Sequence, residues 1–170
     1  MSFDVQTYSP SDVTLVFGGY PLTGWNTITL TKNQPRYNAV RGIRGKNTRY
    51  RNKDMSTTIS FSCLQTGEAN DIMSEIHRQD YAYGTARISL TLKDPNGMML
   101  FHSDEGFITD FPEVVFSGQF EYRVWTIYCL TADSYRVGGN TQAQDSLFNK
   151  VTGFVGDTLT TVSDAVSGIF

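Results

Sequence analysis

The sequence predicts a mainly β fold, a β-rich α+β domain with two packed sheets and one flanking helix. Three observations support this class. Aromatic residues make up 13% of the 170 residues, with 11 Phe and 9 Tyr, and such side chains favour strands. Several short segments alternate between apolar and polar residues, whereas only one segment in the body has a helical period. The pattern therefore indicates a β-sandwich or barrel with a single helix.

Alternating segments account for the strands in the first half of the chain. Residues 13–17 form the first expected strand, and a turn follows at residues 20–25. Residues 27–31 alternate strictly between hydroxyl-bearing and apolar side chains, and within the expected strand 57–64 residues 58–63 do the same. The alternation predicts strands that bury one face and expose the other.

The second half of the chain contains the expected helix and the remaining strands. Residues 68–80 change to a helical period, and Thr66 is the expected N-cap. Further strands are predicted at residues 86–93, 98–101, 106–111 and 119–131, with a turn at residues 94–97. The last of these strands, which we expect to be the longest, has apolar side chains on both faces. That pattern is typical of a central strand or of one buried in an interface.

Three of the expected strands carry short hydroxyl side chains on one face. Ordinary solvent-facing strands usually carry charges that discourage pairing between molecules. Such charges are scarce here, which favours a smooth sheet surface that continues across subunits; the alternative is the general β-propensity of Thr. The residues predicted to form this surface are Thr27, Thr29, Thr31, Thr58, Ser60, Ser62, Ser89 and Thr91.

Charge is distributed unevenly along the chain. Residues 32–53 contain eight of the 14 basic residues and no acidic one, and the rest has six basic and 17 acidic residues, a net charge of −11. A basic segment on an acidic body can bind a second copy head to tail. The alternatives are nucleic-acid binding and a solvated loop. We expect a long loop or extended hairpin tip for subunit contacts, carrying Arg36, Arg41, Arg44, Lys46, Arg49, Arg51 and Lys53.

The sequence lacks the motifs of common enzyme classes. It has no G-x-S-x-G, P-loop or G-x-G-x-x-G pattern, and neither His77 nor His102 has the spacing of a metal ligand. We therefore expect no catalysis, no cofactor, no metal and no small-molecule substrate. Cys63 and Cys129 are expected to be buried thiols, with a disulfide as the alternative. No stretch approaches the about 20 apolar residues of a membrane span, and we expect synthesis in a cytoplasm without a signal peptide.

The C-terminal part differs in composition from the body. We expect a domain at residues 1–132, a polar linker at 133–146 and an amphipathic extension at 147–170. Because glycines weaken a helix, the extension should need a surface on which to dock. The residues expected to dock are Phe148, Val151, Phe154, Val155, Leu159, Val162, Val166 and Phe170.

Several ordered motifs resemble the tail tube proteins of contractile-tailed bacteriophages. They are the opening run at residues 12–25, Thr57-Thr58-Ile59 with residues 64–66, Asn70-Asp71, residues 94–97 with Leu100-Phe101, and residues 123–127. Together they cover about residues 9–132. No single motif is diagnostic, and the resemblance rests on their order.

The resemblance implies a tail-tube β-sandwich that forms stacked hexameric rings inside a contractile sheath, with a channel for genome ejection. The hydroxyl faces would line the lumen, and the basic segment would contact neighbouring subunits. The implied partners are other copies, the sheath, baseplate and tape-measure components, and DNA in passage, with no membrane. The implied location is the tail of the phage virion, after synthesis in the host cytoplasm. The alternatives are a tube component of a type VI secretion-like machine, a baseplate tube-initiator, and a monomeric nucleic-acid-binding module.

Overall fold

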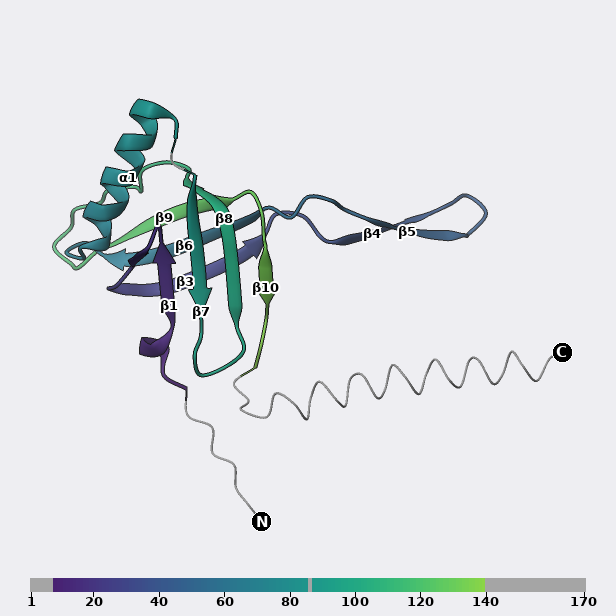
Figure 1. Cartoon of the computed structure of the whole chain (residues 1–170), viewed down its shortest axis with the longest axis horizontal. Coiled ribbons are helices and arrows are strands. Elements are labelled where there is room, and N and C mark those ends of the chain that lie inside the picture. Colours follow the sequence, from purple (N-terminus) through teal and green to yellow (C-terminus); the bar gives the residue numbers. More distant parts are fainter. Residues whose placement is uncertain (1–7, 86, 140–170) are drawn as a thin grey trace, which may run out of the picture.

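A computed structural model describes residues 8–85 and 87–139 (Figure 1). The predicted class is confirmed: the chain is mainly β, with one α-helix. Its elements are a 3-10 turn at Pro10–Asp12, β1 Thr14–Phe17, β2 Tyr20–Pro21, β3 Trp25–Lys32, β4 Tyr37–Arg41, β5 Asn47–Arg51, β6 Thr57–Leu64, α1 Ala69–Tyr83, β7 Ile88–Lys93, β8 Leu100–Ile108, β9 Tyr122–Cys129 and β10 Ser134–Arg136.

Eight strands form one continuous antiparallel sheet that folds over on itself. The strand order is β2-β1-β7-β8-β9-β6-β3, and β10 pairs with β8. In Figure 1, β1, β7 and β8 cross over β3, β6 and β9, so the two predicted layers are present. The layers are joined through β8, whose last residues, Gly106 to Ile108, pair with β9. The remaining strands, β4 and β5, form a separate two-stranded hairpin.

The core lies between the two layers. In β9, Trp125, Ile127 and Cys129 are buried, and in β6 every second residue from Thr57 to Cys63 is buried. These side chains pack against buried residues of the other layer, such as Phe17 and Phe101. Because successive strand residues point to opposite faces, the hydroxyl side chains of Thr58, Ser60 and Ser62 on β6 point away from the core.

The helix α1 is attached to the core through Asn70. Its side-chain oxygen accepts hydrogen bonds from Trp125 Nε1 and Cys63 Sγ, both at 3.0 Å, and its amide nitrogen donates to the backbone oxygens of Leu64 and Gly67. The N-cap position is Glu68, without a side-chain cap, so the prediction of Thr66 as the N-cap is wrong. In place of an N-cap bond, the side chain of Asn70, two residues after Glu68, donates to the Leu64 and Gly67 carbonyls that precede the helix.

Replacing Asn70 by Ala is expected to lower the free energy of unfolding by about 2–3 kcal/mol, because the buried indole N–H of Trp125 loses its acceptor and the Leu64 and Gly67 carbonyls each lose one of their two donors. Guanidinium unfolding measures the effect. Asn96→Ala is the matched control, since Asn96 bonds Ser9 and Asp12 at the surface and should cost less than about 1 kcal/mol. Equal costs for the two variants would contradict the assigned role of Asn70.

Two parts of the strand prediction are wrong. The expected strands at 98–101 and 106–111 are one strand, β8, which at nine residues is longer than β9 with eight. The register between β7 and β8 shifts between the pairs Ile88–Gly106 and Leu90–Ser103. This irregularity interrupts the alternation of buried and exposed residues along β8. In addition, β10 lies in the segment 133–146 that was expected to be a linker. The sheet therefore continues to Arg136.

Candidate assembly surfaces

The structure brings six of the eight predicted hydroxyl residues together. In the β3–β6 register, Thr27 lies opposite Ser62, Thr29 opposite Ser60 and Thr31 opposite Thr58. Directly paired residues share a face, so these six side chains form one surface. The other two, Ser89 and Thr91, lie on β7, which is separated from β6 by β8 and β9. The expected single surface of three neighbouring strands is therefore divided.

The strand β9 extends the surface on its other side. It places Val124 beside Ser62, Thr126 beside Ser60 and Tyr128 beside Thr58. The result is a grid of three residues on each of β3, β6 and β9, and none of the nine carries a charge. We call this surface the uncharged grid. Its residues are Thr27, Thr29, Thr31, Thr58, Ser60, Ser62, Val124, Thr126 and Tyr128.

One border of the grid is an open sheet edge. The strand β3 ends the strand order, with β6 as its only partner among the described residues. Its outward residues, Thr27, Thr29 and Thr31, are exposed and uncharged. Edge strands of monomeric proteins usually carry charges or prolines that block pairing. This edge is therefore suited to pairing with another chain.

The predicted basic segment is the β4–β5 hairpin with its flanks, here called the basic hairpin (residues 36–53). Figure 1 shows it projecting from the body beyond β3 and β6. Every residue of β5 is exposed, and of β4 only Asn38 is half-buried. A two-stranded hairpin without a core is marginally stable in water, so this arm is suited to binding a partner.

The basic hairpin has two different faces. One face carries Arg41, Arg49 and Arg51, and the Arg49 guanidinium lies 4.1 Å from the centre of the Tyr37 ring. The other face is uncharged and pairs Val40 with Thr48 and Asn38 with Tyr50. Val40 and Tyr50 are about half exposed, at 55% and 50%. Arginine beside aromatic and aliphatic side chains is typical of protein–protein interfaces.

A surface that the sequence prediction missed is the connection between β8 and β9, residues 109–121, here called the acidic aromatic loop. It carries Asp110, Glu113 and Glu121 and no basic residue. Large apolar side chains are exposed along it, most of all Phe116 at 84%. Phe111, Phe116 and Phe120 beside the turn-forming Pro112 and Gly118 could have indicated an exposed aromatic loop. The sequence pattern instead predicted strands at both ends of this segment, at 106–111 and 119–131.

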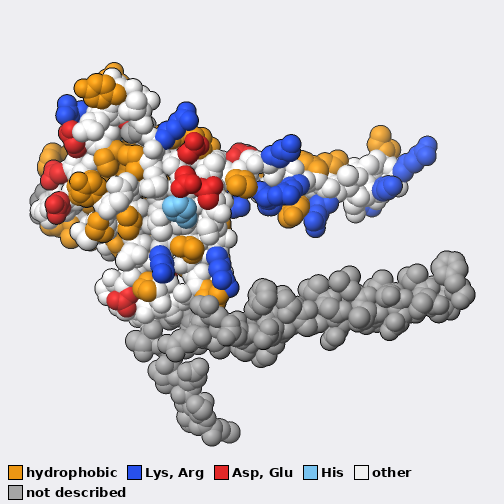
Figure 2. Space-filling view, viewed as in Figure 1, with side chains coloured by type: hydrophobic (Ala, Val, Ile, Leu, Met, Phe, Trp, Pro, Cys, Tyr) orange, Lys and Arg blue, Asp and Glu red, His pale blue; other side chains and the backbone are white. Residues whose placement is uncertain are grey.

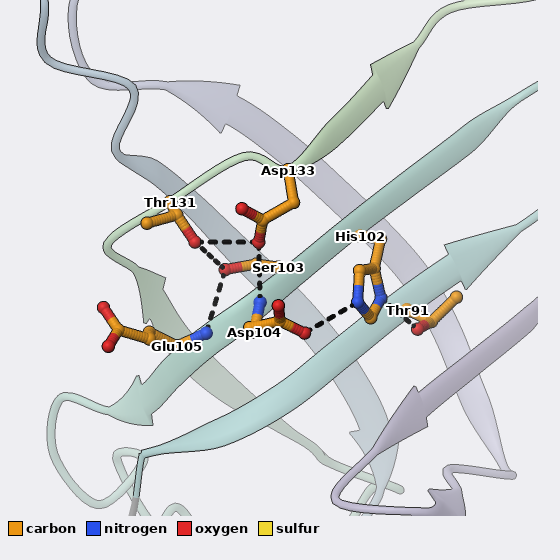
Figure 3. Close-up of polar contacts among 7 residues, drawn as sticks. All are labelled: Thr91, His102, Ser103, Asp104, Glu105, Thr131 and Asp133. Atoms are coloured by element: carbon orange, nitrogen blue, oxygen red, sulfur yellow. Dashed lines mark hydrogen bonds and ion pairs between the residues drawn. The ribbon is translucent and has the colours of Figure 1, made fainter.

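Thr91 belongs to a polar network on the outside of β7 and β8 (Figure 3). Its Oγ1 lies 2.8 Å from His102 Nδ1, and His102 Nε2 lies 2.9 Å from Asp104 Oδ1. Ser103 points inward and contacts Thr131 rather than the imidazole. These neighbouring Ser, His and Asp residues therefore do not form the nucleophile–base pair of a catalytic triad.

Asp133 closes this network and gives it a pH dependence. Its Oδ2 accepts the backbone N–H of Asp104 and the hydroxyl of Thr131, both at 2.9 Å, and these bonds lower the pKa of the carboxyl group. A lowered folded pKa stabilises the fold above the pKa of the unfolded chain, about 3.9, and this contribution disappears as the pH falls through the folded value.

We expect Asp133→Ala to lower the melting temperature slightly between pH 5 and 8, and we expect the difference from wild type to close as the pH falls below about 4. The effect should be small because the carboxyl group is largely exposed. Thermal unfolding followed by circular dichroism across this pH range measures it. A difference that stays constant down to pH 2 would show that the carboxylate charge is not responsible.

The described residues contain no group of three or more His, Cys, Asp or Glu side chains that could hold a metal ion. In the same part of the chain, no helix has the length and apolar character needed to cross a bilayer. Cys63 and Cys129 are buried free thiols. The predicted docking residues between Phe148 and Phe170 lie outside the described residues.

Comparison with known proteins agrees with the resemblance inferred from the sequence. No protein-family model matches the chain. It is 28% identical to structural protein ORF10 of Pseudomonas phage KPP10, over 94% of each protein. Its fold is similar to that of the tube-terminating cap of the anti-feeding prophage, with a TM-score of 0.53, 13% identity, and 80% of this chain and 97% of the cap covered.

A sheath/tube terminator of an extracellular contractile injection system superposes less closely, with a TM-score of 0.44, 12% identity, and 74% of this chain and 94% of that chain covered. The chain shares the β fold of the anti-feeding prophage cap. More particularly, it resembles a phage structural protein over nearly its whole length. The resemblance to a phage structural protein that the sequence motifs predicted is therefore confirmed.

Proposed function

We propose that this chain is a non-enzymatic subunit of a phage tail tube. It assembles into stacked hexameric rings within a contractile sheath, and the channel passes the genome into the host. The observation that carries the proposal is the basic hairpin, an exposed arm that projects from the body and has no core of its own. The similarity to a phage structural protein supports the same role and a place in the virion tail.

The uncharged grid is suited to the wall of the channel. DNA is held by cations, because each phosphate that is neutralised releases counterions and strengthens binding. A surface of hydroxyl and neutral side chains offers no such cation, so DNA would slide past it. The open edge of β3 would pair with a neighbouring subunit and continue the sheet around the ring.

The partners that follow are other copies of the chain, the surrounding sheath, and baseplate and tape-measure components. DNA is a partner only in passage. The basic hairpin belongs to the contacts between subunits, because arginines in the lumen would retain DNA. Its exposed Val40, Ile43 and Tyr50 also fit a protein surface better than a phosphate backbone.

A second candidate function is that of a cap that ends the tube, and the fold similarity to a tube-terminating cap favours it. Antibody labelling of tails with contracted sheaths separates the two functions. Label along the whole exposed tube would support the tube subunit. Label confined to one end would support the cap.

Sedimentation and DNA binding test self-assembly against the nucleic-acid-binding alternative. Purified chain is sedimented at two concentrations and two salt concentrations, and its affinity for DNA is measured by fluorescence anisotropy. The proposed function predicts assemblies that grow with concentration and weaken in salt, with little DNA affinity. A monomer that binds DNA tightly at low salt would overturn it in favour of a nucleic-acid-binding module.

A further inference from the structure

The acidic aromatic loop is held in place by the body of the protein. The buried Arg123 donates to the backbone oxygen of Val115 at 3.0 Å, and its guanidinium lies 5.2 Å from the centre of the Phe116 ring. At the start of the loop, the Phe111 ring packs edge-on against His77, with ring centres 4.5 Å apart. The loop is therefore a fixed surface, which reduces the entropy lost when a partner binds.

This fixed loop nevertheless exposes its apolar side chains. Phe111, Val114, Val115, Phe116 and Phe120 are exposed by 45–84%. Large apolar side chains that cluster on the surface of a protein mark interaction sites. The body of the protein holds the backbone of the loop, and the apolar side chains of the loop face solvent, as expected of a docking site.

Charge identifies the partner. The loop has three acidic and no basic residues, and the basic hairpin has seven basic and no acidic residues. Both surfaces also expose aromatic and aliphatic side chains, so each offers an apolar centre with charges of opposite sign. Surfaces of opposite potential favour the correct partner and speed its encounter.

The two surfaces lie at opposite ends of the molecule. In Figure 1 the basic hairpin projects on one side, whereas the chain between β8 and β9 passes beside α1 on the other. Figure 2 shows basic side chains along the hairpin and acidic and hydrophobic ones around the opposite end. A hairpin cannot reach the loop of its own chain, so the contact must join two copies.

We propose that the acidic aromatic loop of one subunit is the docking site for the basic hairpin of the next. The uncharged hairpin face, with Val40 and Tyr50, packs on Phe116 and Phe120. Arg49 and Arg51 on the other face reach Asp110 and Glu113 at the border. Because the joined surfaces differ, the contact is head to tail and generates rings or filaments. This docking rests on the self-assembly stated under Proposed function and specifies which surfaces form the joint.

Charge reversal tests the proposed joint. One full-length variant carries Arg49→Glu and Arg51→Glu, a second carries Asp110→Arg and Glu113→Arg, and a third carries all four. Each of the first two is expected to associate at least about tenfold more weakly than wild type in sedimentation, and the third should recover most of the loss. Arg49→Lys with Arg51→Lys is the matched control that keeps the charge.

The possible outcomes distinguish a failure of the proposed joint from a failure of the proposed function. If the hairpin variant loses association and the loop variant does not, the receiving surface lies elsewhere and this inference is wrong, although self-assembly stands. Failure of the fourfold variant to recover overturns the charge pairing in the same way. If wild type shows no association at any concentration, the proposed function fails together with the joint.

Disulfide trapping provides a second test that does not depend on charge. A Val40→Cys chain is mixed with a Phe116→Cys chain under mild oxidation, and cross-linked heterodimers are counted. The native thiols give little background, because both are buried and burial raises the pKa of Cys129 to about 11. Cross-linking should be at least about tenfold faster than for Val40→Cys with Tyr83→Cys, where Tyr83 is an aromatic residue of similar exposure, 77% against 84% for Phe116. Equal rates for the two pairs would overturn the docking.

Discussion

Replacing residues 37–51 by a short Gly-Ser turn is expected to leave a folded monomer that no longer assembles. The body should keep its stability, because the hairpin contributes no residue to the core. Assembly should be lost, because the hairpin supplies the basic side of the proposed joint. Thermal unfolding and sedimentation velocity measure the two effects on the same samples.

A hairpin with shuffled uncharged residues serves as the control. Exchanging Ala39 with Asn47, which lie on the face opposite Val40 and Tyr50, keeps every basic residue and every large exposed apolar side chain, and this variant should assemble like wild type. If the chain without its hairpin still forms large assemblies, the joint between copies lies elsewhere. If that chain unfolds, the hairpin supports the body in a way that its exposure does not show.

Introducing an arginine into the uncharged grid is expected to make the assembled protein retain DNA. In Thr29→Arg every subunit adds one cation to the surface assigned to the channel wall, and cations that neutralise phosphates hold DNA. We expect DNA retention by assembled rings to rise at least about tenfold at low salt and to fall again as salt is added. A filter or co-sedimentation assay with labelled DNA measures this change.

Thr85→Arg is the matched control, because Thr85 is also exposed but lies beyond the end of α1. DNA retained by the Thr29→Arg assembly should be protected from nuclease, since it would lie inside the ring. DNA bound to the Thr85→Arg assembly should be digested. Equal retention and equal digestion for both variants would show that the grid does not face a channel.

Local patterns predicted most of the strands and the faces they expose. The period of two at residues 27–31 and 57–64 directed Thr29 and Ser60 to the same side, because side-chain direction in a strand is a local property. Strand neighbours are decided by pairings between distant residues. The separation of Ser89 and Thr91 from the other hydroxyl rows was therefore not readable from the sequence.

The remaining errors have local physical causes. The register irregularity between β7 and β8 breaks the alternation of apolar and polar residues along β8. The sequence pattern therefore predicted two strands, at 98–101 and 106–111, in place of one. The three residues of β10 are too few to show a period. In the acidic aromatic loop, apolar residues suggested strand ends, yet Arg123 binds the backbone of Val115 and leaves the loop's side chains outward. A buried arginine in that role has no sequence signature.

The most direct test of the central claim, that this chain builds a hollow tube from copies of itself, is negative-stain electron microscopy of the purified full-length protein at two concentrations and two salt concentrations. The account predicts hollow rings, stacked into tubes at the higher concentration and fewer at the higher salt concentration, because the proposed joint is electrostatic. Solid aggregates or single particles under all four conditions, with no central channel, would contradict it.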